Sequence, residues 1–96
     1  MWIQTQNKQR IINSDQIIDI FIDKTGKIIY AETTRDGDFF TLGEYKDRDT
    51  CMKILDALSL IGTNIPIMTM PLGGEVETWL KDTAELAKYY VIKEFK

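Results

Sequence analysis

The side chains that could carry chemistry in this chain are few. There is no histidine, so the commonest general base and metal ligand is missing, and with it every Cys–His or Ser–His pair. Glu32, Asp36 and Asp38 flank a predicted tight turn and could gather a calcium ion, but the ligand loop of an EF-hand is absent. Because Asp and Gly are also the residues that such a turn needs, we favour a plain solvated turn.

The single cysteine is a second candidate. Cys51 lies near the start of a predicted helix, where the helix dipole can lower the pKa of a thiol. Asp47 and Asp49 oppose that effect, and the apolar stripe of the helix includes Cys51. We therefore interpret Cys51 as a small buried side chain rather than a reactive thiol.

A glycine pair is the third candidate. Gly73 and Gly74 precede a predicted helix and could let backbone N–H groups meet an anion. No Lys-Ser or Lys-Thr follows them, and the next charged residues, Glu75 and Glu77, repel phosphate. We interpret this pair as a flexible joint, and we expect no catalytic residue, no metal site and no cofactor in the chain.

Composition narrows the class of protein. The chain has 96 residues, a net charge of −3 and an isoelectric point near 4.8, with acidic and basic residues interspersed. One domain over residues 1–96 is expected at this length, and direct nucleic-acid binding is not expected at this charge. One cysteine excludes an internal disulfide, and no apolar run is long enough to span a membrane. With no apparent secretory leader, we expect a cytoplasmic protein.

The first half of the chain, residues 1–46, reads as mainly β-structure. Turn signals at Lys24-Thr25-Gly26 and around Asp36-Gly37 separate apolar runs. In the clearest run, Ile18, Ile20 and Ile22 alternate onto one face. Gly43 interrupts the last run and suggests a β-bulge. The five predicted strands cover residues 2–5, 10–13, 16–23, 27–33 and 39–45.

The second half predicts two helices with an extended segment between them. Residues 47–61 form an amphipathic helix capped by Asp47, with an apolar stripe through Cys51, Ile54, Leu55, Leu58 and Ile61, and Gly62 is its expected terminator. Residues 65–70, bracketed by prolines, predict an extended or edge strand. Residues 75–95 predict a C-terminal helix, although Tyr89–Ile92 is β-prone and leaves open whether the helix continues or a strand begins.

One group of apolar side chains is a candidate interaction surface. Methionine and aromatic residues are enriched at adaptable interfaces, and such residues flank the stripe of the C-terminal helix or lie just upstream of it. Core packing is the competing interpretation, and the two interpretations stay open. The candidate interface residues are Trp79, Leu86, Tyr90, Met68 and Met70.

Two short motifs resemble a known group. The start, Trp2-Ile3 with Thr5-Gln6 and Lys8, and the later run Leu42 to Lys46, resemble short uncharacterised proteins of low-GC Gram-positive bacteria, their phages and mobile elements. Those proteins share W-I-x-[ST]-Q-x-K and L-G-x-Y-K before an acidic-rich helix, and the match covers about the first sixty positions. The resemblance implies a bacterial accessory protein and carries over no activity and no functional residue.

The sequence therefore predicts an α+β fold. It consists of an antiparallel meander of about five strands, packed by one amphipathic helix, with a C-terminal helix beside it. We expect a non-enzymatic protein-interaction module, self-associating or binding a protein partner, that contacts no nucleic acid and no membrane. The alternative is an accessory protein that modulates a host nucleic-acid-directed machine by binding its protein component.

Overall fold

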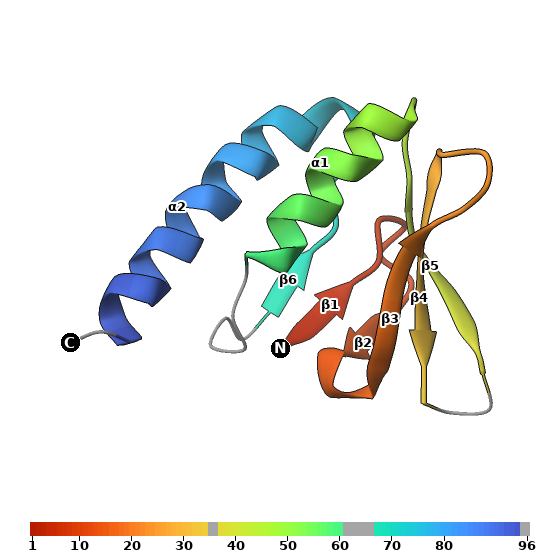
Figure 1. The fold of residues 1–96 in the computed structure, drawn as a ribbon, viewed down its shortest axis with the longest axis horizontal. Helices are drawn as coiled ribbons and strands as arrows, with labels where there is room; N and C mark the ends of the chain where they lie inside the picture. The colour runs from red at the N-terminus through yellow and green to blue at the C-terminus, as the bar shows by residue number, and fades with distance from the viewer. Residues whose placement is uncertain (35–36, 61–66, 95–96) are drawn as a thin grey trace.

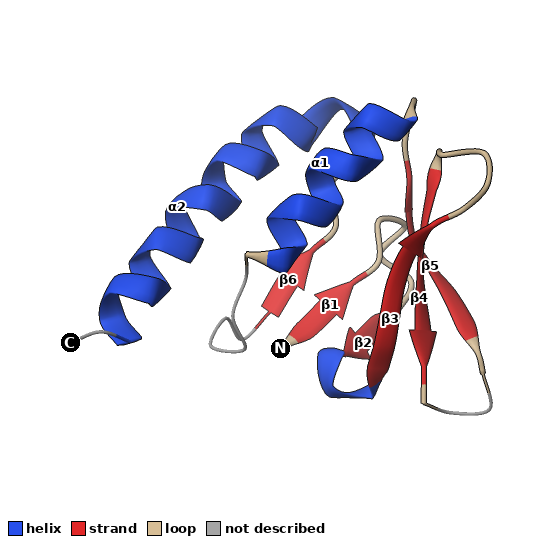
Figure 2. Cartoon of the chain, in the orientation of Figure 1, coloured by secondary structure: helices blue, strands red, loops and turns tan. Residues whose placement is uncertain are grey.

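The computed structural model describes residues 1–34, 37–60 and 67–94, with side chains up to Leu86. Six strands and two α-helices follow one another along the chain, with a single 3₁₀ turn before the third strand and another before the last helix (Figures 1 and 2). The strands are β1 (Trp2–Gln4), β2 (Ile11–Asn13), β3 (Ile17–Ile22), β4 (Ile28–Thr33), β5 (Phe39–Glu44) and β6 (Ile67–Thr69). The helices are α1 (Arg48–Ser59) and α2 (Val76–Glu94).

The six strands form two three-stranded sheets rather than one meander. Sheet A has the order β2-β1-β6, and sheet B has the order β3-β4-β5. The α+β class and the C-terminal helix are confirmed, and the antiparallel meander is present as sheet B. Asn13 caps a 3₁₀ turn over Ser14–Gln16, which redirects the chain after β2, so β3 begins a second sheet instead of extending the first. In Figure 1 the strands of sheet A run obliquely to those of sheet B.

The third strand of sheet A comes from far along the chain. Strand β6 pairs parallel with β1 and lies at the edge of the sheet, as the prolines around it predicted. Its partner residues are Trp2 with Ile67 and Ile3 with Met68. Parallel strands need a crossover connection, and in this chain the crossover contains sheet B and α1.

A bulge in β3 changes which of its residues face the core. Ile17 pairs with Thr33 and Asp19 with Glu32, so Ile18 is an extra residue in the ladder. The prediction that Ile18 shares a face with Ile20 and Ile22 is therefore wrong, and Ile18 is 60% exposed. Because a bulge shifts the alternation of side chains by one residue, Ile17 takes its place on the face that packs against the core.

The core lies between the inner faces of the two sheets and α1. The cap predicted at Asp47 is confirmed, because its carboxylate accepts hydrogen bonds from the Thr50 N–H at 2.8 Å and the Thr50 hydroxyl at 2.7 Å. Helix α1 ends at Ser59, two positions before its predicted end, and Gly62 lies outside the described residues. The largest fully buried core side chains are Ile3, Ile29, Leu42, Cys51, Ile54 and Met70.

Helix α2 resolves the ambiguity at Tyr89–Ile92. The helical backbone runs from Val76 to Glu94, so these β-prone residues continue the helix. The first turns of α2 pack beside α1, where Val76 and Thr83 are buried (Figure 1). In Figure 1 the C-terminal half of α2 extends past the end of α1.

One glutamine side chain connects the two sheets to each other. The Gln6 backbone N–H donates to the Leu42 carbonyl at 2.8 Å, and the Gln6 Oε1 accepts from the Glu44 N–H at 2.8 Å. Its Nε2 donates to the carbonyls of Glu44 at 3.0 Å and Pro71 at 3.1 Å. The Tyr45 hydroxyl donates to the same Pro71 carbonyl at 2.9 Å. The end of β1, the end of β5 and the segment after β6 are thus held together by one carboxamide and one phenol.

A second bulge, predicted at Gly43, is confirmed and makes room for that phenol. Ile29 pairs with Gly43 and Tyr30 with Thr41, which leaves Leu42 as the extra residue. A Cβ atom at Gly43 would lie 2.6 Å from the Tyr45 hydroxyl oxygen and 2.7 Å from its ring. The ring cannot easily withdraw, because Tyr45 is buried and its hydroxyl is bonded to Pro71. Burial also raises the pKa of Tyr45, which keeps the hydroxyl protonated and able to donate.

The clash at Gly43 gives a stability test. We expect Gly43→Ala to lower the free energy of unfolding by about 1–3 kcal/mol, the usual cost of overpacking a filled site. Gly73→Ala is the matched control, because a Cβ atom at that position would meet no other atom within 4 Å, and its effect should stay within about 0.5 kcal/mol. Urea denaturation of both variants measures the difference. Equal stability of the two would show that Tyr45 does not fill the space beside Gly43.

Candidate functional site

Among the residues predicted as an interface on or near the C-terminal helix, those whose side chains the structure describes do not form one surface. Met68 in β6 and Met70 directly after it are buried, at 6% and 1% exposure, so they belong to the core and are not part of an exposed surface. Trp79 is partly buried against the core, and its Nε1 donates to the Thr69 carbonyl at 2.9 Å. Leu86 is 44% exposed, and the side chain of Tyr90 lies outside those described.

The indole of Trp79 thus anchors α2 to the edge strand β6. A Trp N–H that finds a backbone acceptor while its rings pack against the core is a structural contact. The core-packing interpretation holds for Trp79, Met68 and Met70. Of the five predicted residues, Leu86 remains as an exposed apolar side chain whose surroundings the structure describes.

The chemistry-bearing candidates are placed as follows. Cys51 is fully buried, and burial, followed by the charges of Asp23 and Asp47, raises the pKa of its thiol. Asp36 lies outside the described residues, so the turn that it shares with Glu32 and Asp38 is described only in part. Within the described ranges, no three Cys, Asp or Glu side chains come together as a metal site would require. Nor does any helix within those ranges combine the length and apolarity needed to cross a membrane.

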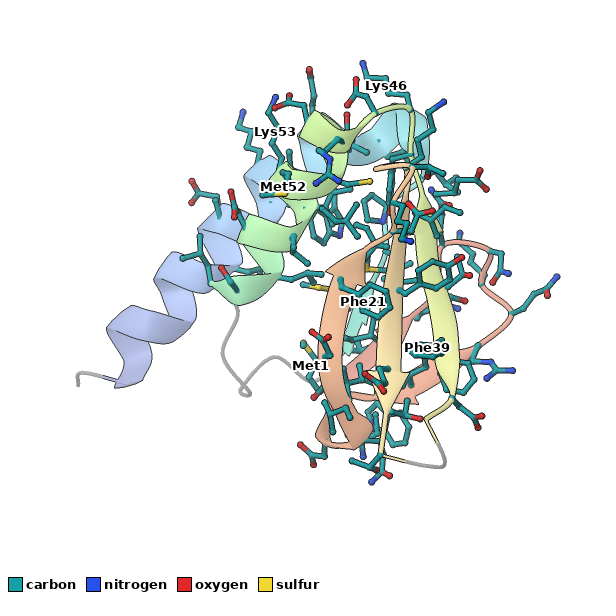
Figure 3. All side chains as sticks on the ribbon, turned by 45° about the vertical axis from the view of Figure 1, so that its right-hand side comes forward. Met1, Phe21, Phe39, Lys46, Met52 and Lys53 are labelled. Atoms are coloured by element: carbon teal, nitrogen blue, oxygen red, sulfur yellow. The ribbon has the colours of Figure 1, made fainter. Side chains whose placement is uncertain are left out.

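A surface that the sequence did not predict lies on the outer side of sheet B. Two rows of side chains cross its three strands there. By register, one row is Asp19, Glu32 and Phe39, and the other is Phe21, Tyr30 and Thr41. We call these six residues the aromatic–acidic face. In Figure 3, Phe21 and Phe39 lie over the near side of the sheet, away from α2.

Phe21 packs against the other two aromatic rings of this face, Tyr30 and Phe39. Phe21 lies 5.7 Å from Tyr30 and 5.7 Å from Phe39 between ring centroids, the latter in an edge-to-face arrangement. Such pairs are worth roughly 0.5–1.5 kcal/mol each beyond their buried area, so mutual packing accounts for part of their presence. It leaves Phe39 57% exposed, so more than half of this side chain is free to meet a partner.

Two carboxylates accompany the rings. Asp19 and Glu32 are register partners on the same side of the sheet, and like charges directly opposite one another are destabilising. No Lys or Arg of the described residues lies within 4.0 Å of either carboxylate; the ion pair among those residues joins Lys53 and Asp49 on α1. A face that combines packed rings with carboxylates that no described cation approaches suits a basic partner, since a cation can meet both at once.

A second feature is a hollow of about 740 Å³ where sheet B meets the free edge of β2. We call it the β2 hollow. The guanidinium carbon of Arg10 stands 4.0 Å above the centroid of the Phe40 ring at its rim. Thr33 contributes to its wall and is 4% exposed, and its buried hydroxyl has no hydrogen-bond partner among the residues that the structure describes. The lining residues are Trp2, Arg10, Ile11, Ile12, Asn13, Gln16, Thr33, Asp38 and Phe40.

Sequence reasoning missed both features for one reason, which is that each depends on strand register. Regular alternation places Asp19 and Phe21 on the same face of their strand. It does not say which residues of the neighbouring strands lie beside them, because that depends on how β3, β4 and β5 pair. The signal that was available is the aromatic content of the meander, with Phe21, Tyr30 and Phe39 each in a different predicted strand.

The unpartnered hydroxyl of Thr33 gives a second stability test. A buried hydroxyl without a partner costs about 1–3 kcal/mol, so Thr33→Val, which keeps the shape, should raise the free energy of unfolding by about 1 kcal/mol. Thr5→Val is the control, because Thr5 is equally buried but its hydroxyl donates to Asn7 Oδ1 at 2.7 Å; this variant should be destabilised. Denaturant unfolding measures both. A loss of stability in Thr33→Val would mean that the hydroxyl has a partner.

The burial of Cys51 gives a third test. We expect a maleimide or disulfide reagent at neutral pH to label Cys51 in the folded protein only slowly, because the thiol is inaccessible and its pKa is raised. Adding denaturant should make the labelling fast. An added thiol in Ser59→Cys, at an exposed position of α1, supplies the accessible reference. Labelling of native Cys51 as fast as that reference would reopen a redox role.

The chain was compared with protein-family models, with curated proteins and with solved structures, and none of these comparisons gave a match. The resemblance to short proteins of Gram-positive bacteria and their mobile elements therefore stays a prediction. The function of the chain has to follow from its own surfaces, and the aromatic–acidic face and the β2 hollow are two of these.

Proposed function

We propose that this protein is a small non-enzymatic interaction module whose partner is a protein with a basic surface. The observation that carries the proposal is the aromatic–acidic face of sheet B. Phe21 packs against both Tyr30 and Phe39, and Phe39 is mostly exposed. These rings stand beside two opposed carboxylates without a nearby cation among the described residues. Aromatic residues are the side chains most enriched at protein interfaces.

A basic protein fits this face better than a nucleic acid does. Exposed rings on a sheet can stack on bases, but such proteins also need cations to meet the phosphates. Here the two charges on the face are both negative, and the chain as a whole carries −3. Arginine or lysine side chains of a partner would instead gain both cation–π contacts and charge-assisted hydrogen bonds.

Self-association, the other prediction from the sequence, is less well supported by this face. A two-fold contact places the same patch on both subunits, so it would bring Asp19 and Glu32 of one copy toward the same residues of the next. Four carboxylates would then have to be desolvated together without a cation, which is costly. A second copy therefore remains an alternative that would have to use another surface, such as the one around Leu86.

The alternative of an accessory protein acting on a nucleic-acid-directed machine gains support from the same charges. Proteins that bind nucleic acids present basic surfaces to the phosphates. An acidic and aromatic face is complementary to such a surface, and competition for it would be the simplest way to modulate the machine. This alternative specifies the partner of the proposed module further and adds no new site.

The test is affinity capture from a nuclease-treated Gram-positive lysate with wild-type protein and surface variants. We expect Phe39→Ser and Glu32→Lys each to lower the recovery of a bound protein at least about tenfold, as truncations of central contact residues do. Phe39 is mostly exposed but packs against Phe21, so Phe39→Ser should lower the melting temperature by only several degrees and stay folded at the assay temperature. The bound proteins should be basic, and the wild-type protein should sediment as a monomer at micromolar concentration.

The control separates the two candidate surfaces. Leu86→Ser changes an exposed apolar side chain on α2, away from sheet B, and should leave capture unchanged. If Leu86→Ser abolished capture or dissociated a dimer while Phe39→Ser did neither, the interface would lie on the C-terminal helix and the proposal would be wrong.

A further inference from the structure

We propose that the free edge of β2 is a strand-addition site, which accepts an extended segment of a partner protein over the β2 hollow. This site is separate from the aromatic–acidic face, and its test does not depend on that face. The proposal stands on the backbone groups that β2 leaves unpaired and on the side chains of sheet B beside them.

The unpaired backbone groups follow from the hydrogen-bond pattern between β1 and β2. The Thr5 N–H donates to the Arg10 carbonyl at 2.9 Å, and the Ser14 N–H donates to the Met1 carbonyl at 2.8 Å. Hydrogen-bonded and non-hydrogen-bonded pairs alternate along an antiparallel ladder. Ile12, which lies between Arg10 and Ser14, is therefore hydrogen-bonded to its partner Ile3 in β1. The N–H groups of Ile11 and Asn13 and the carbonyl of Ile11 therefore point away from β1.

Nothing else in sheet A covers that edge. Strand β2 is the terminal strand of the order β2-β1-β6, and no other described residue donates to or accepts from those three groups of Ile11 and Asn13. Exposed sheet edges of this kind are templates on which an extended chain can add one more strand. The other edge of the sheet, at β6, is partly covered by the Trp79 indole.

Sheet B supplies a wall for the incoming strand. Phe40, the register partner of Ala31, and Thr33, which is buried, lie on its inner face, and both contribute to the wall of the β2 hollow. A strand added to β2 would extend sheet A over them and direct every second side chain into the hollow. An apolar side chain fits against the Phe40 ring, and a polar atom at that depth would offer the buried Thr33 hydroxyl the partner that it lacks.

The rim of the hollow indicates the charge of the segment. The Arg10 guanidinium lies over Phe40, and no carboxylate of the described residues approaches it within 4.0 Å. Asp38, the other charged residue of the lining, is two positions from Phe40 in the chain. The preferred occupant is thus an extended segment of alternating apolar and polar residues with one acidic side chain placed at Arg10, because an opposite charge there forms a charge-assisted pair.

The experiment uses the whole chain and a capped synthetic peptide of about eight residues, the length of an ordinary strand. The peptide alternates valine with polar residues and carries one glutamate. NMR spectra of the ¹⁵N-labelled protein should show shifts at Ile11 and Asn13, and hydrogen exchange at these two amides should slow when peptide is added. Two N-methylated isomers, each blocked at alternate amides, distinguish backbone pairing, because one of the two should lose binding and the other should keep it.

Reversing the charge of Arg10 tests whether the acidic residue of the added segment lies beside it. Arg10→Glu should weaken binding of the glutamate peptide about tenfold, and a peptide with lysine in place of glutamate should regain that affinity on the variant. Lys46→Glu, at an exposed position outside the lining, is the matched control and should change neither. The inference is overturned if millimolar peptide shifts no β2 amide, if the shifts fall only on Phe21, Tyr30 and Phe39, or if both N-methylated isomers bind alike.

Discussion

The rest of this fold depends on the hydrogen bonds of one side chain, Gln6. Its carboxamide has two donors and one carbonyl oxygen, and it directs them to backbone groups of β5 and of the segment after β6. Those backbone groups lie where the two sheets meet, so no ladder can satisfy them. The bond to the Pro71 carbonyl is partly buried, and a peptide group left there without a partner would be costly. The Gln6 amide supplies that partner. Sheet A is thereby fixed against sheet B at one corner, and the opposite corner is left open as the β2 hollow.

The same junction explains why two distant motifs of the sequence belong together. Thr5 and Gln6 come from the first, and Leu42 to Tyr45 come from the second. In the structure Gln6 bonds to Leu42 and Glu44, Gly43 clears the space for the Tyr45 ring, and the Tyr45 hydroxyl shares the Pro71 carbonyl with Gln6. Both motifs therefore describe one structural joint. This accounts for their residue types without assigning them any chemistry.

Features decided within a few residues were predictable from the sequence, and features decided by strand pairing were not. The Asp47 cap, the Gly43 bulge and the burial of Cys51 each follow from a local pattern. The partition into two sheets, the bulge at Ile18 and the burial of Met68 and Met70 follow from which strands pair and in what register. The secondary structure of Tyr89–Ile92 was also not predictable from these residues alone, because the preceding helix continues through them despite their β propensity. The aromatic–acidic face forms only when three strands are aligned, so it could not be predicted from any single segment.

The parallel pairing of β1 with β6 has a consequence for the time order of folding. Sheet B is built from neighbouring strands joined by short turns, whereas the bond from Thr69 to Gln4 spans 65 positions of the chain. Contacts between distant positions form slowly, because the ends of a long loop must first meet. During synthesis β1 and β2 cannot complete sheet A until β6 has left the ribosome. During that interval the edge of β1 that later pairs with β6 is unpaired. An unpaired strand edge can pair with another chain, so it is a site for aggregation or for binding by a chaperone.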